Sequence, residues 1–157
     1  MKKLKNPYAQ YDGYNCFGCD PGNSFGLKMS FYEDGDEIVS RWSPEEQYQG
    51  YFRVLHGGIQ ATLMDELASW VVFVKCKTSG MTGSIQVSYV KSVSVDEGEI
   101  EVRGLLESQE KKKARIHCRL YQAGELKSEG FCEYMIFSEQ LARRKFHYPG
   151  VEAFYGA

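Results

Sequence analysis

Two adjacent acidic side chains stand inside a long apolar segment of the sequence. Asp65 lies within residues 59–74, which are apolar nearly all round a helical projection. Burying a carboxylate there costs several kcal/mol unless it is paired or solvated. A structural hydrogen bond is one reason for its presence, and catalysis as a general base or nucleophile is the other. Glu66 points about 100° away round the helix, so the two acids cannot serve one pocket, and we favour Asp65.

A glycine pair precedes this segment. In His56-Gly57-Gly58 the glycines stand where the helix should begin, and the first turn of a helix leaves backbone N–H groups without partners. With the positive end of the helix dipole, these groups would stabilise a developing oxyanion, and glycine would let an acyl carbonyl approach the backbone. The alternative is a tight turn into the helix, which is the better explanation when the triplet is considered alone.

One face of the expected helix carries small or polar side chains at spacings of three and four. The residues on this face are Gly58, Ala61, Thr62, Asp65, Ser69 and Val72. Small side chains allow close approach, either by a symmetry-related helix or by a narrow substrate. Asp65 lies in the middle of this face.

The elements around the helix are expected to be β-strands. Residues 27–32 and 37–42 flank an Asp-Gly step and predict a β-hairpin, and the long helix follows from His56 to about Cys76. After the helix, apolar and polar residues alternate with a period of two. Four strands are predicted there, beginning near Thr82 and covering residues 99–103, 114–121 and about 126–137. Short connections favour antiparallel pairing of these strands, which gives an α+β fold.

The chain is predicted to form one domain. Residues 27–138 contain the periodic segments, whereas residues 1–26 are rich in turn-forming residues and are expected to be loop-like. Residues 139–157 form a C-terminal extension whose basic run, residues 143–145, is interpreted as a solvated surface. The aromatic residues of this otherwise irregular extension predict packing against the body of the protein or against a partner.

Composition limits the classes of function. Hydrophobic residues make up 43% and charged residues 25% of the 157 residues, which is typical of a globular domain with a single core. A formal net charge of -2 gives no electrostatic reason to expect nucleic acid binding. The longest apolar stretch, residues 70–74, is too short for a bilayer, so no membrane association is expected. An odd number of cysteines and a basic start without an apolar segment favour a reduced, cytoplasmic location.

Taken together, the motifs resemble a known family. The spacing from His56 to Asp65, with the glycine pair behind the histidine, resembles the signature of hotdog-fold acyl-CoA thioesterases of the PaaI-like, phenylacetate-degradation type. Residues 49–51, 61–66 and 82–91 are similar to the helix start, the helix and the following strand of that family. Cys16-Phe17-Gly18-Cys19 resembles an N-terminal element that one branch carries.

This resemblance implies a hotdog fold, in which an antiparallel β-sheet wraps around one long central α-helix. It implies hydrolysis of acyl thioesters, carried by coenzyme A or by an acyl carrier, to free acid and thiol. Asp65 would act as general base or nucleophile, and a glycine amide would polarise the carbonyl. Thr82, which the partner subunit could supply, would help to position water. The residues that the resemblance assigns to the catalytic site are Asp65, Gly57, Gly58, His56, Gln49 and Thr82.

Substrate contacts and partners follow from the same resemblance. Arg53, Thr62 and Glu66 are predicted to contact the substrate. Phe52-Arg53 stands where the family usually has Pro-Gly, and Ser92 replaces a usual proline. The Arg53 guanidinium could contact phosphates or a substrate carboxylate, close a pocket or face solvent. The resemblance also implies a homodimer that builds each site from both subunits and that can pair into a tetramer. No cofactor is expected apart from the coenzyme A of the substrate.

Three further possibilities compete with this interpretation. Cys16 and Cys19 have the spacing of metal ligands, but no second pair with that spacing exists, so no metal site is predicted. A non-catalytic module that binds or senses acyl-CoA would need the tunnel but not the acid. A hydratase acting on enoyl thioesters is less favoured, because the helix shows no acid and base pair arranged for hydration.

Overall fold

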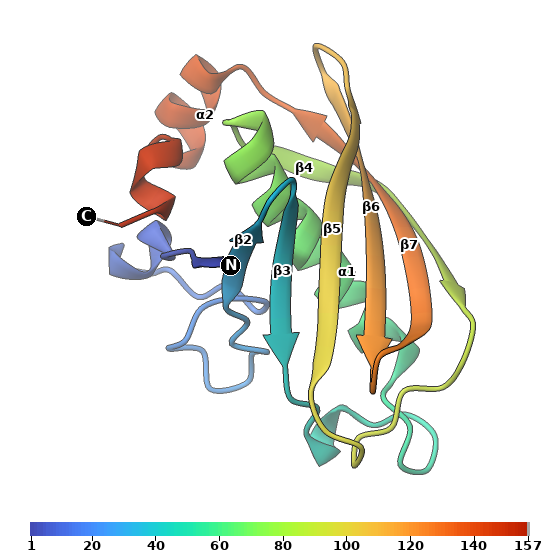
Figure 1. Cartoon of the computed structure of the whole chain (residues 1–157). Helices are drawn as coiled ribbons and strands as arrows, with labels where there is room; N and C mark the ends of the chain where they lie inside the picture. The colour runs from blue at the N-terminus through green and yellow to red at the C-terminus, as the bar shows by residue number, and fades with distance from the viewer. Residues whose placement is uncertain (157) are drawn as a thin grey trace.

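The computed structural model describes residues 1–156 of the chain (Figure 1). Within them the strands are β1 (Lys2–Lys3), β2 (Phe31–Asp34), β3 (Glu37–Trp42), β4 (Gly80–Tyr89), β5 (Ile100–Gln109), β6 (Lys113–Gln122) and β7 (Glu125–Ile136). Helix α1 (Gly57–Val71) continues into a π-helical turn, Val72–Cys76, and helix α2 covers Glu139–Phe146. Short 3₁₀ turns occupy Pro7–Gln10, Glu46–Tyr48 and Val151–Phe154.

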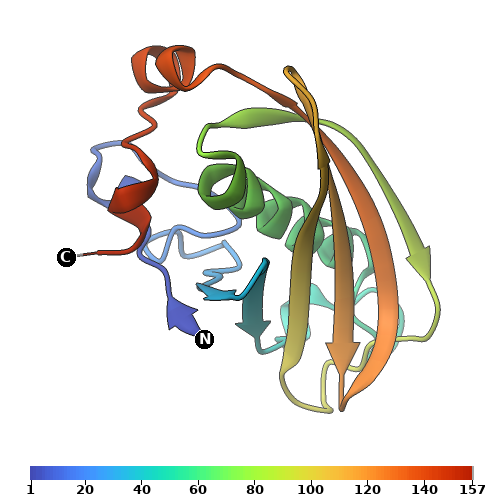
Figure 2. The same ribbon diagram turned by 45° about the horizontal axis from the view of Figure 1, so that its top comes forward.

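The strands form one antiparallel sheet in the order β1-β2-β3-β5-β6-β7-β4. The sheet curves around α1, so its concave face encloses the helix (Figure 1, Figure 2). This arrangement is the hotdog fold, an α+β architecture, and the predicted fold class is confirmed. None of the helices in the part of the chain that the structure describes is long and apolar enough to cross a membrane.

Helix α1 forms the centre of the core because its apolar residues cover most of its circumference. Its buried residues are Gln60, Leu63, Met64, Leu67, Ala68, Trp70 and Val71. The Trp70 ring stacks on Phe31 of β2 with 4.1 Å between ring centroids. The helical path ends at Lys77, whose φ of 55° is left-handed and cannot continue the helix. The predicted helix from His56 to about Cys76 is therefore confirmed.

The predicted β-hairpin exists, but the bounds of its first strand were wrong. β2 and β3 pair through a turn in which Gly35 has a φ of 62°, a conformation that favours glycine. The first strand was expected at residues 27–32, whereas β2 begins at Phe31. Leu27 instead lies in a loop and is buried, and its carbonyl accepts a hydrogen bond of 2.8 Å from the Trp42 indole. That side-chain bond replaces a strand partner.

Strand β4 does not pair with the strand that follows it, contrary to the prediction from short connections. β4 pairs with β7 at one edge of the sheet, and β5 pairs with β3 and β6. The connection, residues 90–99, instead runs across the end of the sheet. It is held there by Val93, which is fully buried, and by Ser94, whose backbone N–H donates to Gln122 Oε1. The other edge of β4 has no partner strand among residues 1–156.

A β-bulge decides which side chains of β4 face the helix. Thr82 lies opposite Tyr134 and Ser84 lies opposite Glu133, so Gly83 is an extra residue. The extra residue shifts the alternation of the strand by one position. As a result Thr82 shares the inner face of the sheet with Ile85, although simple alternation would place it with Ser84 on the outer face.

The two terminal segments pack against the end of α1 (Figure 2). Residues 1–26 are loop-like as expected, except for β1, which pairs with β2, and one 3₁₀ turn. The C-terminal extension was expected to be irregular, and this is wrong, because it contains α2 with Ser138 as its side-chain cap. Phe154 is fully buried, so the aromatic residues pack against the body of the protein. Residue 157 of the extension lies outside the described residues.

Candidate active site

The N-terminus of α1 provides one free backbone amide. His56 is the N-cap, and its Nδ1 atom accepts a hydrogen bond of 2.8 Å from the Gly58 amide. The Gly57 amide has no acceptor within hydrogen-bond distance among residues 1–156. Of the two glycine amides predicted to polarise a carbonyl, Gly57 is therefore the one available to a ligand.

Four of the predicted residues border one cavity beside this helix end. The cavity has a volume of about 300 Å³, and its lining includes Gln49, His56, Gly58 and Thr62. Thr62 Oγ1 donates to the Gly58 carbonyl at 2.8 Å, so its side chain is held along the helix. Gln49 Oε1 accepts a hydrogen bond from the Arg53 amide, which shapes the loop before the helix. The structure thus brings together residues that the sequence separates by up to thirteen positions.

Asp65 is held by two hydroxyl groups. Thr82 Oγ1 donates to Asp65 Oδ1 at 2.8 Å, and the Tyr134 hydroxyl lies 2.6 Å from the same oxygen. The second carboxylate oxygen, Oδ2, has no donor within hydrogen-bond distance in the described part of the chain. Thr82 and Asp65 make this contact within one chain. One oxygen is therefore fixed, and the other is left for water or substrate.

Tyr134 is a residue of this site that the sequence did not predict. It faces inward from β7, directly opposite Thr82. Burial, and next the negative charge of Asp65, raise the pKa of Tyr134 well above its usual value, so the phenol stays protonated and remains a donor. One signal was available, because a buried tyrosine hydroxyl usually needs a hydrogen-bond partner.

The two parts of the predicted site lie far apart within one chain. Gly57 and Asp65 are separated by eight positions along α1. At a rise of about 1.5 Å per residue they are roughly 12 Å apart along the helix axis. The free amide and the carboxylate of one chain cannot therefore act on the same carbonyl group.

Arg53 lies at the surface of the loop before α1. Its guanidinium pairs with Asp96 at 2.5 Å, and its side chain is 68% exposed. Its backbone has a φ of 60°, in the left-handed region that favours glycine. Arg53 is not among the residues that line the cavity beside Gly58. Its predicted contact with substrate stays a prediction.

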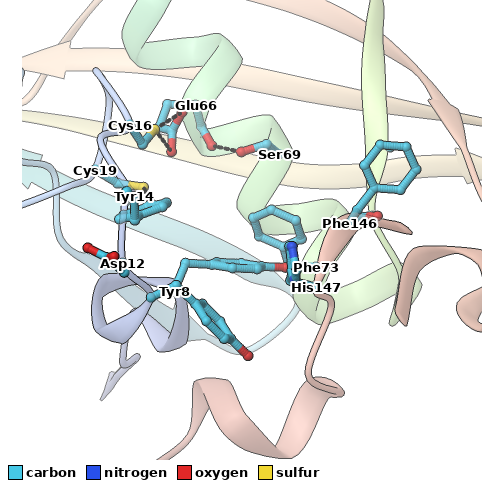
Figure 3. A pocket seen from close by; sticks show the side chains of 14 residues that line it. Tyr8, Asp12, Tyr14, Cys16, Cys19, Glu66, Ser69, Phe73, Phe146 and His147 are labelled. Carbon is cyan, nitrogen blue, oxygen red and sulfur yellow. Dashed lines mark hydrogen bonds between the residues drawn. The ribbon is translucent and has the colours of Figure 1, made fainter. Parts of the chain in front are cut away.

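Glu66 faces a different part of the molecule from Asp65. It borders a larger cavity of about 600 Å³ between α1 and the terminal segments (Figure 3). Its carboxylate lies 3.6 Å from the thiol sulfur of Cys16, which Figure 3 shows beside it. Burial raises the pKa of Glu66 to about 7. Hydrogen bonding from Cys19 lowers the pKa of Cys16 to about 5. The two adjacent acids therefore serve separate environments.

The sequence of the central region identifies the family. The family model described as the thioesterase superfamily matches residues 52–129. That range contains helix α1, the whole of β4 to β6, and both Asp65 and Thr82. The chain belongs to the thioesterase superfamily. Membership of the PaaI-like subtype stays a prediction.

Solved structures share the fold of this thioesterase superfamily member. A hypothetical thioesterase from Streptococcus pneumoniae TIGR4, in a structure with coenzyme A, has a TM-score of 0.65 and 16% identity over 71% of this chain and 90% of that chain. A protein from Streptococcus mutans UA159 bound to acetyl-CoA has a TM-score of 0.67 and 11% identity over 83% and 98% of the two chains. Thioesterase superfamily member 2 from Mus musculus has a TM-score of 0.63 and 22% identity over 69% of this chain and 83% of that chain. No curated protein sequence matched the chain.

Proposed function

We propose that the protein hydrolyses acyl thioesters to free acid and thiol, with acyl-CoA as the substrate class and Asp65 as general base or nucleophile. The observation that carries this proposal is the fixed Asp65 carboxylate, whose Oδ1 is held by two hydroxyls while Oδ2 is free. A carboxylate held in this way presents one oxygen to water or to a thioester carbonyl. Coenzyme A and acetyl-CoA in structures of two proteins of the same fold support the choice of substrate class.

The Gly57 amide completes the proposed chemistry. Attack on the thioester carbonyl places negative charge on its oxygen, and an N–H group at a helix N-terminus stabilises that charge. Gly57 has no acceptor of its own, and the absence of a side chain leaves its amide approachable. The neighbouring residues His56, Gln49 and Thr62 border the adjacent cavity and would contact the acyl group or the thiol arm.

Two copies of the chain are needed to bring this amide and Asp65 together. Tyr89, at the end of β4, donates a hydrogen bond to the Gly57 carbonyl at 2.6 Å, whereas Thr82, near its start, contacts Asp65. If the free edge of β4 pairs antiparallel with β4 of a second copy about Ile85, the start of one strand lies opposite the end of the other. Asp65 of one copy then approaches Gly57 of the second copy. A homodimer with two composite sites follows from this pairing.

The surface of β4 is suited to such pairing. Met81, Ile85 and Tyr89 are large apolar residues with exposed fractions of 55%, 36% and 52%. Exposed apolar side chains on an unpaired edge strand favour association with another strand. The proposed dimer would cover them.

Thiol release from acyl-CoA esters of short, medium, long and aromatic acyl groups tests the proposed function. Asp65→Asn should lower kcat by roughly 10²- to 10⁴-fold, because the amide cannot act as base or nucleophile. Asp36→Asn is the matched control, since the same change at an exposed hairpin turn should leave the rate unchanged. Calorimetric titration with a non-hydrolysable acyl-CoA analogue should show that Asp65→Asn still binds ligand.

Two results would overturn the proposal. Wild-type turnover by Asp65→Asn would exclude the role of this carboxylate. Tight binding of acyl-CoA by the wild type, without turnover of any ester in the panel, would instead establish a non-catalytic binding module.

A further inference from the structure

Three metal-ligating side chains that the proposed hydrolysis does not use converge beside α1. Cys16 and Cys19 come from the N-terminal loop, and Glu66 comes from the helix, fifty positions after Cys16. One ligand atom from each residue lies within 4.8 Å of the other two. Figure 3 shows the two sulfurs and the carboxylate at one end of the larger cavity, which all three residues border.

The carboxylate of Glu66 lacks a positive partner. It forms no ion pair with any residue of the described chain, and its side-chain hydrogen-bond donor is the Cys16 thiol at 3.6 and 3.7 Å. A thiol is a weak donor, and a largely buried carboxylate without compensation costs several kcal/mol. A bound cation would remove this cost.

The loop is shaped to lie directly against this carboxylate. A Cβ atom added to Gly18, between the two cysteines, would lie 2.5 Å from the Cγ and Cδ atoms of Glu66. A side chain at position 18 would therefore push the Glu66 carboxylate away from the Cys16-to-Cys19 turn. Donors also surround the second sulfur, because the Tyr14 hydroxyl lies 3.0 Å and the Asn6 amide 3.6 Å from Cys19 Sγ. Such outer contacts are typical of the groups that orient metal ligands.

The ligand types, and the separation between Cys16 and Glu66, fit a tetrahedral zinc ion. With zinc–sulfur bonds of about 2.3 Å and zinc–oxygen bonds of about 2.1 Å, tetrahedral geometry gives a sulfur–oxygen separation of about 3.6 Å. The Cys16 sulfur lies 3.6 Å from Glu66 Oε1. Thiolate ligands favour zinc over magnesium and calcium, which prefer oxygen.

We propose that Cys16, Cys19 and Glu66 bind one Zn²⁺ per chain, with water in a fourth position that faces the larger cavity. The ion clamps the N-terminal loop to α1 at the residue next to Asp65, and so links this loop to the helix that carries the catalytic carboxylate. Spacing within the sequence did not predict the site, because the third ligand is neither a cysteine nor near the pair. The inference does not depend on thioester hydrolysis.

Cobalt binding tests this site directly. The reduced, full-length protein is stripped of metal with a chelator and titrated with Co²⁺. The expected result is one Co²⁺ per chain, with a thiolate-to-cobalt charge-transfer band in the near ultraviolet, visible bands of tetrahedral intensity, and displacement of Co²⁺ by Zn²⁺. The double variant Cys16→Ser/Cys19→Ser should lose the charge-transfer band. Glu66→Gln should weaken Co²⁺ binding at least tenfold.

Matched controls separate this site from other thiols and from the proposed active site. Cys76→Ser alters a cysteine outside the cluster, and Asp65→Asn alters the catalytic carboxylate, so both should bind Co²⁺ as the wild type does. Failure of the wild type to bind Co²⁺, or a charge-transfer band that persists in the double variant, would overturn the proposal. If the double variant does not fold, as judged by circular dichroism, the affinity of Glu66→Gln decides, and wild-type affinity there would overturn it.

Discussion

Asp65 places a carboxylate in an apolar helix, and two hydroxyl groups offset the cost of that placement. Hydrogen bonds to a charged acceptor are each worth about 1.5–3 kcal/mol. Thr82 and Tyr134 both act on Oδ1, so they stabilise the charge and also fix the direction of Oδ2. The two contacts that stabilise the charge of Asp65 are therefore the same two that would orient its carboxylate in the proposed catalysis.

Removing the hydroxyl group of Tyr134 should lower activity while the ring still fills its place in the core. We expect Tyr134→Phe to reduce kcat on the order of 10- to 100-fold, the equivalent of one hydrogen bond to a charged group. KM should change little, because Tyr134 contacts Asp65 rather than the cavity beside Gly58. Steady-state kinetics of thiol release measures both constants. The conservative variant Thr82→Ser keeps its hydroxyl and should retain most of the wild-type rate.

The pH dependence of the same variant gives an independent check. Because burial raises the pKa of Tyr134 above its usual 10.0, the phenol should stay protonated throughout the working range. The alkaline side of the kcat profile should then be the same in wild type and Tyr134→Phe up to about pH 10. An alkaline loss of activity that the wild type shows and Tyr134→Phe lacks would mean that Tyr134 does ionise.

At the scale of elements, local patterns predicted the helix and most strands but not their partners. The alternation around Ile85 identified β4, and the apolar segment around Leu67 identified α1. Pairing of β4 with β7 joins residues about fifty positions apart, which no local period records. The bulge at Gly83 could not be predicted either, because the local sequence gives no sign of it. Its one extra residue moves the Thr82 side chain from the outer face of the sheet to the inner face. The contact of Thr82 with Asp65 depends on both features.

The C-terminal extension is an integral part of the core. Phe154 is fully buried, and its ring centroid lies 5.4 Å from that of Trp70 and 5.3 Å from that of Phe73. Phe154→Ala should lower the free energy of unfolding by about 3–5 kcal/mol, because it leaves a cavity among large rings. Urea unfolding followed by tryptophan fluorescence measures the change.

Replacement of an exposed phenylalanine by alanine is the control. Phe25 is 83% exposed, so Phe25→Ala should change the free energy of unfolding by no more than about 0.5 kcal/mol. Equal unfolding free energies for Phe154→Ala and the wild type would show that the extension is not part of the cooperative core.

Each chain carries the two groups of the proposed site at opposite ends of strand β4. The free Gly57 amide lies near the end of β4, and Asp65 lies near its start. Twofold pairing about the middle of this strand would bring Asp65 of each chain close to the Gly57 amide of the other, which gives two sites per dimer. The proposed dimer would then explain both the exposed edge of β4 and the separation of Gly57 from Asp65 within one chain.

Mixing two inactive variants tests this composite site. Gly57→Pro removes the amide hydrogen at the first helical residue, where proline is tolerated, and His56, with ψ of 132°, already has a conformation compatible with a following proline. Asp65→Asn removes the carboxylate. Each variant alone should be inactive. Refolded together in equal amounts, about half of the dimers should be mixed with one intact site each, which restores about a quarter of wild-type activity.

Gly57→Ala is the control that isolates the amide. Its Cβ would lie 3.3 Å from the Tyr89 ring, a crowding that proline also introduces, yet alanine keeps its N–H group. We therefore expect Gly57→Ala to stay active, and the mixture to gain activity over both separate variants. A mixture that remains inactive while mixed dimers form, as shown by native mass spectrometry, would mean that amide and carboxylate do not cooperate across the strand. Recovery near a quarter would mean that each catalytic centre belongs to the pair of chains, since neither variant can supply both groups to one thioester.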